Sequence, residues 1–428
     1  MIRARFLLAC ALALLAAGPA HAQLRGHGGP VRSLAVSPDG RLALSGSFDQ
    51  SAILWALDGG AALMVLRVHD GAVNAVAALP DGRFATAGED GRIALWRGAA
   101  EAPETLLTGH QGPIAALAVS PDGMTLASAA WDGTARLQPL AGGPARVLEG
   151  HGGNVNGIAF LPDGRAVTAG YDLTLRVWPR EEGGAATVAT LPAPLNAVAA
   201  APDGEIVTAG ADGVVRLLDA GLRPRAEIET GGKPVIALAL SPDGRRIAAA
   251  SVGGSVAIID RAAARIAYTL VGPGLPVWSV AYRPDGSELL TGGSDRLVRR
   301  WDARSGEHIG PVVMAPVADV FAGLEGDRGA EVFRACVACH TLTPDDGNRA
   351  GPTLHGLFGR RIASLPGYAF SPALKGMDIV WTPETVSALF EQGPSRYTPG
   401  TKMPEQTIPD PADRDALVRF LERTTARQ

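Results

Sequence analysis

The tripeptide Pro-Asp-Gly occurs seven times at almost even intervals, and this spacing constrains the fold more than any other feature of the sequence. Successive prolines lie 42, 41, 41, 40, 40 and 42 residues apart. Proline fixes φ and Asp-Gly tolerates positive φ, so each tripeptide predicts a tight turn between two strands. A period of about 40–45 residues is typical of four-stranded propeller blades. The seven prolines are Pro38, Pro80, Pro121, Pro162, Pro202, Pro242 and Pro284.

The residues around each turn repeat as well. An apolar strand precedes the turn, as in residues 31–37, and a second strand after it ends in Gly or Ala, a variable residue and Asp, as in residues 170–172. These patterns predict an all-β, seven-bladed propeller over residues 23–314. Residues 307–313 could supply the outer strand of the seventh blade, whereas residues 23–25 are short for that role. A third strand in each blade closes on an aromatic or aliphatic residue, namely Trp55, Trp96, Leu137, Trp178, Leu218, Ile259 and Trp301.

Composition agrees with this interpretation and excludes other classes of protein. The chain has 54 glycines and 32 prolines among 428 residues, which favours short strands and many turns over long helices. A hydrophobic share of 46% and a charged share of 19% are typical of a globular protein. The formal net charge of −4 indicates no basic surface for nucleic acid or an anionic membrane. Three cysteines are too few for a disulfide-stapled scaffold.

Three blades carry the dipeptide Gly-His before the first strand, at residues 26–27, 109–110 and 150–151, and Val68-His69 is a degenerate copy. Together with the even period, these dipeptides make the region similar to the WD40 family of seven-bladed propellers. The resemblance implies that each His meets, in a buried hydrogen-bond network, the aspartate that follows the second strand of its blade. We call this residue the turn aspartate; it is not the Asp of Pro-Asp-Gly. Blades five to seven lack Gly-His, so we expect them to be held more by apolar packing. The matching aspartates are Asp49, Asp90, Asp132 and Asp172.

The propeller sequence contains no recognisable set of catalytic residues. It has five histidines and no cysteine, and the expected network accounts for four of the five histidines. No metal-ligand spacing and no Ser-His-Asp arrangement is left over. We therefore interpret the propeller as a surface for docking other proteins, and an enzymatic activity of its own is not expected.

Residues 1–22 have the organisation of a secretory signal peptide. Arg3 and Arg5 precede an apolar run over residues 6–17, and Ala20-His21-Ala22 forms a cleavage site before Gln23. About a dozen apolar residues are too few to cross the roughly 30 Å of a bilayer core. The sequence therefore predicts a periplasmic or otherwise exported protein that starts at Gln23 and has no membrane span.

The two remaining cysteines form the motif Cys336-Val337-Ala338-Cys339-His340, which is typical of covalent haem attachment. Two thiols three residues apart can both add to the haem vinyl groups, and the next residue then places an imidazole on the iron. A thioredoxin-like pair would lie in an α/β pattern, and a zinc site would need a second pair of ligands. Neither is present, so we expect one haem c, held by Cys336 and Cys339 and ligated by His340.

A methionine 63 residues after His340 is the expected second axial ligand. Met403 lies in a loop stiffened by Pro399, Gly400 and Pro404. Ligation by Met and His raises the reduction potential and leaves no open position on the iron, which suits electron transfer. Met377, in a less constrained Lys-Gly-Met-Asp stretch, is the alternative methionine.

Residues 326–425 as a whole resemble a class I cytochrome c of the mitochondrial and c2 type. The family motifs follow in order at residues 351–360, 366–368, 381 and 397–403. The resemblance implies a small all-α domain in which a first helix, near residues 327–335, crosses a last helix near residues 411–424. It also implies that Gly329 permits their close approach and that Phe333 meets Phe420.

The same resemblance implies the surroundings of the haem. The carbonyl of Pro352 would accept a hydrogen bond from His340 Nδ1, and the haem propionates would be lined by Arg360, Tyr368 and Trp381, with Tyr397 also close to the haem. The position at which many relatives place a tyrosine hydroxyl against the axial sulfur falls here on Leu389 or Phe390. We therefore expect the sulfur of Met403 to lack that hydrogen bond.

Together these segments predict a signal peptide (residues 1–22), a WD40-like propeller (23–314), a short linker (315–323) and a cytochrome c domain (324–428). The expected function is one-electron transfer by an exported single-haem cytochrome that docks redox proteins through its haem edge and propeller face. One alternative is an oxidoreductase whose propeller binds a substrate or second cofactor and passes electrons to the cytochrome. A second alternative is a scaffold in which the haem senses redox state.

Overall fold

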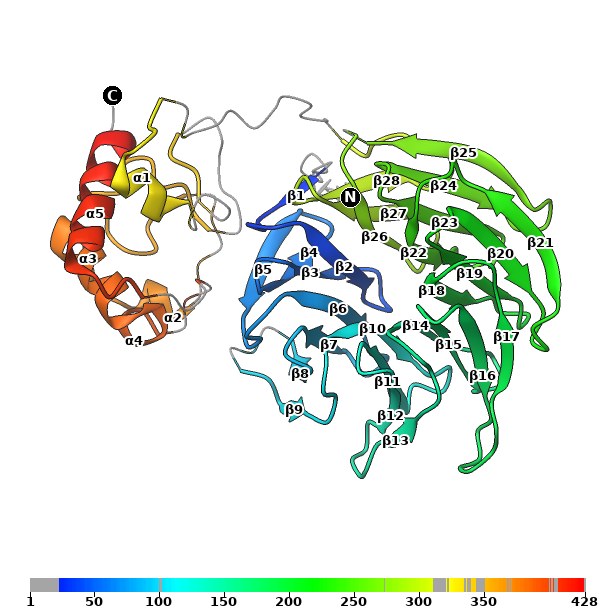
Figure 1. Ribbon diagram of the computed structural model, residues 1–428. Helices are drawn as coiled ribbons and strands as arrows, with labels where there is room; N and C mark the ends of the chain where they lie inside the picture. The colour runs from blue at the N-terminus through cyan, green and yellow to red at the C-terminus, as the bar shows by residue number, and fades with distance from the viewer. Residues whose placement is uncertain are drawn as a thin grey trace, which may run out of the picture.

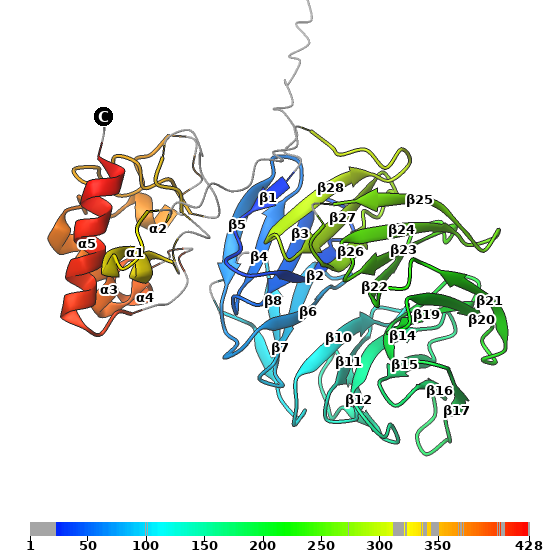
Figure 2. The ribbon, with the colours of Figure 1, turned by 45° about the horizontal axis from the view of Figure 1, so that its top comes forward.

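The computed structural model describes residues 23–426 except for 99, 101, 273, 311–320, 322, 335, 337–339, 344–350, 367, 369, 371, 400, 402 and 404–406. The expected signal peptide, most of the expected linker and Cys339 lie outside the described residues. A β-propeller is followed by a smaller helical domain, which lies beside blade one in both views (Figures 1 and 2). In the described part of the chain, no helix combines the length and the apolar character needed to cross a membrane.

The propeller consists of seven four-stranded antiparallel sheets arranged around one axis (Figure 1). Blade one has β2 (Val31–Val36), β3 (Leu42–Ser47), β4 (Ala52–Ala56) and β5 (Ala61–Leu66); blade two has β6 (Val73–Ala78), β7 (Arg83–Gly88), β8 (Ile93–Arg97) and β9 (Thr105–Leu107); blade three has β10 (Ile114–Val119), β11 (Thr125–Ala130), β12 (Ala135–Pro139) and β13 (Arg146–Leu148). Blade four has β14 (Val155–Phe160), β15 (Ala166–Gly170), β16 (Thr174–Trp178) and β17 (Thr187–Thr190); blade five has β18 (Leu195–Ala200), β19 (Ile206–Gly210), β20 (Val214–Leu218) and β21 (Pro224–Glu229). Blade six has β22 (Val235–Leu240), β23 (Arg246–Ser251), β24 (Ser255–Asp260) and β25 (Arg265–Val271); blade seven has β26 (Val277–Tyr282), β27 (Glu288–Gly293), β28 (Leu297–Asp302) and β1 (Gln23–Arg25).

The Pro-Asp-Gly turns lie where the period predicted them, between the first and second strands of each blade. In all seven the glycine has a φ between 68° and 89°, a conformation that glycine adopts without a steric penalty. In blade one the amide of Gly40 donates to the carbonyl of Ser37 at 2.8 Å, and Asp39 Oδ1 accepts from the amide of Arg41 at 3.0 Å. The turn residues therefore supply both the backbone geometry and its hydrogen bonds.

The ring is closed by the N-terminal strand, which is the shorter of the two segments considered. Strand β1 pairs antiparallel with β28, so that Leu24 lies opposite Val298. The side chain of Leu24 is buried in the apolar core shared by blades one and seven. In the described part of the other candidate, residues 307–310, there is one bridge, between Trp301 and His308, whose ring centroids lie 3.8 Å apart. Three residues suffice because the buried leucine anchors the strand.

Four blades contain the expected histidine networks, which are thereby confirmed. In blade one His27 Nδ1 lies 3.0 Å from Asp49 Oδ2, and its Nε2 lies 2.7 Å from Ser45 Oγ, which also accepts from Trp55 Nε1 at 2.7 Å. The carboxylate accepts a further bond from the amide of Gly28. Blades two, three and four repeat the His–Asp contact at 3.1, 2.9 and 3.0 Å.

Blades five and seven have apolar cores, and each also contains a polar pair that the sequence analysis did not predict. In blade five Arg216 reaches Asp212 at 2.6 Å and Glu227 at 2.9 Å. In blade seven Arg299 reaches Asp295 at 2.7 Å. An arginine four residues after the turn aspartate thus replaces the histidine as its partner. The spacing Asp-x-x-x-Arg does not predict this by itself, because blades three and four have it too, at Asp132–Arg136 and Asp172–Arg176, and pair their aspartates with histidine.

The helical domain is built on two crossing helices, as predicted. Its helices are α1 (Arg328–Phe333), α2 (Pro372–Lys375), α3 (Pro383–Gln392), α4 (Pro394–Tyr397) and α5 (Pro411–Thr425). A Cβ at Gly329 would overlap the carbonyl oxygen of Ala416, so only glycine permits this approach of α1 to α5. The rings of Phe333 and Phe420 meet with centroids 5.3 Å apart. This crossing places the apolar face of α5 against the core of the domain.

We predict that closure of the ring depends on Leu24. Replacing this buried side chain by alanine is expected to lower the free energy of unfolding of the propeller by about 2–5 kcal/mol, because it leaves a cavity between β1 and β28. Leu106→Ala is the matched control, since Leu106 also lies in an outer strand but is 40% exposed. Denaturant unfolding measures both changes, and equal losses for the two variants would contradict the closing role of β1.

A second prediction concerns pH. Burial of the Asp172 carboxylate acts to raise its pKa, but hydrogen bonds from Gly152, Thr174 and His151 outweigh this effect and lower the pKa to about 2. Burial of the His151 imidazole lowers its pKa below 6.5. Both groups therefore bind protons more readily in the unfolded chain, so stability falls as pH falls, first below about 6.5 and again between about 4 and 2.

Thermal unfolding of the wild type and of Asp172→Asn across this range checks the second prediction. The variant is expected to lose about 1–3 kcal/mol near neutral pH and to show a smaller loss of stability in the acidic window. Asp163→Asn is the control, because Asp163 belongs to the exposed turn of the same blade and pairs with Arg165 at the surface. An unchanged acid profile in Asp172→Asn would count against the network as its source.

Candidate haem-binding site

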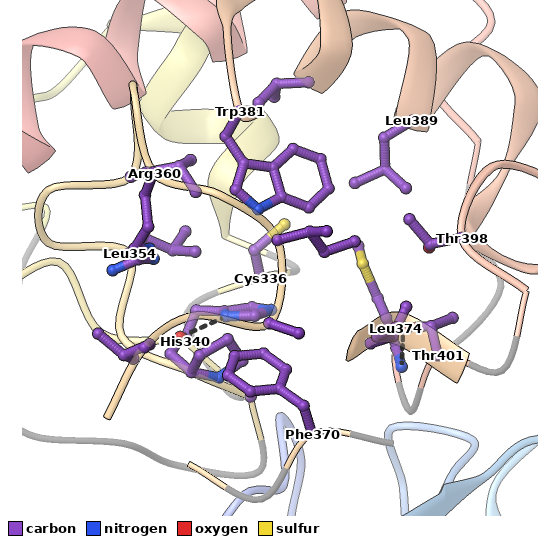
Figure 3. Close-up of a pocket in the computed structure, with 18 of the residues that line it drawn as sticks. Cys336, His340, Leu354, Arg360, Phe370, Leu374, Trp381, Leu389, Thr398 and Thr401 are labelled. Carbon is purple, nitrogen blue, oxygen red and sulfur yellow. Dashed lines mark hydrogen bonds between the residues drawn. The ribbon is translucent and has the colours of Figure 1, made fainter. Parts of the chain in front are cut away.

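The helical domain encloses an apolar cavity of about 1140 Å³, measured with its open mouth (Figure 3). Leu417 and Leu421 of α5 form part of its wall, and α3 contributes Leu389 and Phe390. Phe333 of α1 lines the cavity as well, so the crossing helices α1 and α5 both contribute to its wall.

Cys336 and His340 present the attachment motif to this cavity. The amide of His340 donates to the carbonyl of Cys336 at 3.0 Å, and both residues line the cavity. The Nδ1 atom of His340 lies 2.8 Å from the carbonyl oxygen of Pro352 (Figure 3). A carbonyl only accepts, so Nδ1 carries the proton and Nε2 carries the lone pair, which is the tautomer that binds iron. The other cysteine of the motif, Cys339, lies outside the described residues.

Met403 also lines the cavity, whereas Met377 does not. The segment before Met403 is fixed by hydrogen bonds. Thr398 Oγ1 donates to the carbonyl of Pro394 at 3.0 Å, and the amide of Met403 donates to Thr401 Oγ1 at 3.1 Å. Figure 3 shows Thr398 and Thr401 across the cavity from His340. The geometry therefore favours Met403 over Met377 as the second axial ligand.

Pro352 lines the cavity, and so do three of the four other residues expected near the haem. They are Arg360, Tyr368 and Trp381. The guanidinium of Arg360 donates to the carbonyls of Thr353 and His355 at 2.9 and 3.0 Å. The fourth, Tyr397, lies at the end of α4 and packs against the apolar core of the domain instead of lining the cavity.

Other lining residues carry no sequence signal of their own. Ile362, Phe370 and Leu374 complete the wall near the mouth, and Tyr368 and Phe370 pack edge to face at 4.7 Å. An apolar residue is the default choice for any core, so sequence reasoning has no means of separating a cofactor wall from ordinary packing.

The donors and walls of the cavity fit a haem. One thiol, one imidazole with its tautomer set and one thioether face a space with otherwise mostly apolar walls. Among the residues that the structure describes, no group of three His, Cys, Asp or Glu side chains is arranged to hold a bare metal ion. The set corresponds to the Met/His ligation of c-type cytochromes.

Comparison with known proteins supports both halves of the chain. The family "WD domain, G-beta repeat" matches seven times, at residues 18–56, 60–97, 102–137, 142–179, 186–219, 224–260 and 265–302. The family "Cytochrome c" matches residues 326–425. Cytochrome c of Arabidopsis thaliana is 44% identical over 112 residues, which are 26% of this chain and 97% of that protein. Those of Cochliobolus lunatus and Stellaria longipes are 43% and 41% identical, each over 24% of this chain and 95% of the relative.

Leu389 and Phe390 both line the cavity. A tyrosine placed at either position therefore tests whether a hydroxyl near the Met403 sulfur changes the haem. We predict that one of the variants Leu389→Tyr and Phe390→Tyr raises the reduction potential, because a hydroxyl that donates to the Met403 sulfur withdraws electron density from the ligand. Val386→Thr, which adds a hydroxyl elsewhere on α3, is the control. Redox titration followed by absorption measures the change. The hypothesis is wrong if neither tyrosine moves the potential beyond the control.

Proposed function

Because the chain belongs to the WD-repeat family over residues 18–302 and to the cytochrome c family over residues 326–425, we propose that it is an exported electron carrier whose propeller docks it to redox proteins. The cytochrome c domain implies one covalently attached haem c. The observation that carries the proposal is that His340 and Met403 line the same apolar cavity, with Pro352 setting the histidine tautomer.

The residues that line the cavity support this function as iron ligands and as apolar walls. A bound haem c supplies a one-electron Fe(III)/Fe(II) couple. His340 and Met403 would supply the protein ligands of the iron, a pair that suits electron transfer. Leucine and phenylalanine side chains of α3 and α5 exclude water, and a low-dielectric wall disfavours the extra charge of the oxidised state. The chain's own residues thereby favour electron transfer over chemistry on a bound substrate.

The propeller is best suited to docking. Four of its histidines are engaged by aspartate and by Ser or Thr in the blade networks, and His308 stacks on Trp301. In blades one to four, these contacts use both ring nitrogens that a second cofactor would need as ligands. We therefore assign the propeller to protein recognition, and the partners to redox proteins of the periplasm or another exported compartment.

The proposal predicts that Met403→Leu alters the haem and that Met377→Leu does not. Loss of the thioether is expected to abolish the weak long-wavelength band of methionine-ligated ferric haem and to lower the reduction potential. Met377→Leu is the matched control, because Met377 lies in the same domain outside the cavity. Absorption spectra and redox titration of the purified full chain measure both effects.

Intact mass spectrometry of the same preparation tests export and haem content together. The proposal expects a chain that begins at Gln23 and carries one haem. Additional cofactor bands in the absorption spectrum would contradict the single-haem carrier. So would loss of the long-wavelength band in Met377→Leu.

A further inference from the structure

The cavity of the candidate haem site takes one of its lining residues from the propeller. Val65 lines it, whereas all the other lining residues lie between Phe333 and Leu421 of the helical domain. Val65 belongs to β5, the outer strand of blade one, which is the blade beside the helical domain in both views (Figures 1 and 2). In Figure 3 the blue ribbon of the propeller passes close to Phe370 of the cavity wall. Blade one therefore covers a part of the cavity that the helical domain leaves open.

The position of Val65 in its blade repeats around the propeller. Val65 pairs with Ile53, which lies four residues after the turn aspartate of blade one. In blades two to six, the residue paired with the same third-strand position is its structural equivalent, counted in blade six from Gly253 in place of the aspartate. These equivalents are Leu106, Val147, Val188, Glu227 and Thr269.

All five equivalents are exposed to solvent. The three apolar ones are 40%, 37% and 46% exposed in blade order, and the glutamate and the threonine are exposed as well. Val65 differs from them because it is partly buried: it packs against the core of blade one and also lines the cavity of the other domain. An outward-facing position of the propeller is thus covered in the blade that lies beside the helical domain.

The wall on the helical side is formed without help from the propeller. All residues of the segment 361–365 line the cavity. The amide of Ile362 donates to the carbonyl of Ile379 at 2.8 Å, and Ser364 Oγ donates to the carbonyl of Arg361 at 2.6 Å. Ala363 has a φ of 56°, a conformation that few residues other than glycine adopt. Because these contacts lie within the helical domain, Val65 adds to a wall that is already fixed.

Val65 brings hydrocarbon and no polar atom to the cavity. The charged side chain of the segment 361–365 is Arg361, which is exposed and pairs with Asp378 at 3.5 Å. The apolar shell around a metal centre controls the access of water and the local dielectric, and thereby the reduction potential. Ferric haem carries one more positive charge than ferrous haem, so an apolar cover disfavours the oxidised state and raises the potential.

We propose that blade one caps the haem cavity, and that Val65 is a positioning residue of the haem site which the propeller supplies. The contact shields the haem from water and holds its reduction potential above the value that the helical domain would set alone. This inference rests on the proposed electron-carrier function. It assigns the propeller a part in the redox site in addition to docking.

The first test replaces Val65 by asparagine in the full haem-loaded chain. Asparagine is polar but uncharged, whereas a carboxylate at this position would be attracted to Arg361 in the same cavity wall. Water is expected to enter where the valine methyl groups were. The reduction potential of Val65→Asn, measured by redox titration followed by absorption, should therefore shift to a lower value.

Val188→Asn is the matched control. Val188 is the same residue type at the equivalent position of blade four, and it is 46% exposed. Its replacement should leave the potential unchanged, and so should Val65→Ile, which keeps an apolar side chain at the cap. If Val65→Asn fails to fold, Val65→Thr provides the test, because threonine keeps the shape of valine and adds one hydroxyl. A potential of the position 65 variant equal to that of Val188→Asn would overturn the inference.

The second test detects the contact itself and does not depend on the redox state. The photo-reactive amino acid p-benzoylphenylalanine is placed at position 65 or, as the control, at position 188 of the full chain. After irradiation, peptide mapping by mass spectrometry should find residue 65 joined to peptides from residues 333–421 and residue 188 joined to none of them. Absence of these products at position 65 would contradict the cap.

The long-wavelength band of methionine-ligated ferric haem should persist in Val65→Asn, because His340 and Met403 are unchanged. Failure of the cap would leave one haem with this band and no shift in potential. Failure of the electron-carrier proposal would instead appear in the wild type and in Met403→Leu, so the two are distinguished.

Discussion

The pairing of β1 with β28 joins two segments that lie more than 270 residues apart in the sequence, and the ring of blades depends on it. Strand β1 covers the edge of β28 that would otherwise be unpaired, and its Leu24 is buried in the core shared by blades one and seven. Blades one and seven share further bonds across this seam. Arg300, ion-paired with Glu288, donates to the carbonyl of Leu57 at 2.7 Å. A three-residue strand thus fixes the geometry of a much larger domain.

The turn aspartate of a blade needs a partner, and the propeller supplies it in two ways. Blades one to four use a histidine from the loop before the first strand, which ties that loop to the second and third strands. Blades five and seven use an arginine of the third strand instead. Both solutions compensate the burial of a carboxylate, because a buried charge is tolerated only when it is paired and hydrogen-bonded.

In the proposed function, the helical domain carries the chemistry and the propeller carries recognition. In the helical domain, close contact between Gly329 and α5 shapes one wall of a cavity in which an imidazole and a thioether meet. In the propeller, the histidine and aspartate side chains of blades one to four could resemble catalytic groups, but they are hydrogen-bonded to one another within the blades. Exposed aromatic rings, among them Trp131 and Tyr171, remain on the propeller surface and suit it to binding.

The sequence by itself determined the blade number, the seven turns and the haem attachment motif. These follow from local chemistry: proline and glycine restrict or permit particular φ values, and Cys-x-x-C-H has its reactive groups at fixed spacing. The crossing of α1 with α5 was predicted from the resemblance to cytochrome c. Only the tertiary structure decided which segment closes blade seven, that arginine replaces histidine in blades five and seven, and that Tyr397 packs away from the cavity. Each of these depends on residues brought together from distant parts of the chain, where apolar pattern and residue type alone do not specify the neighbour.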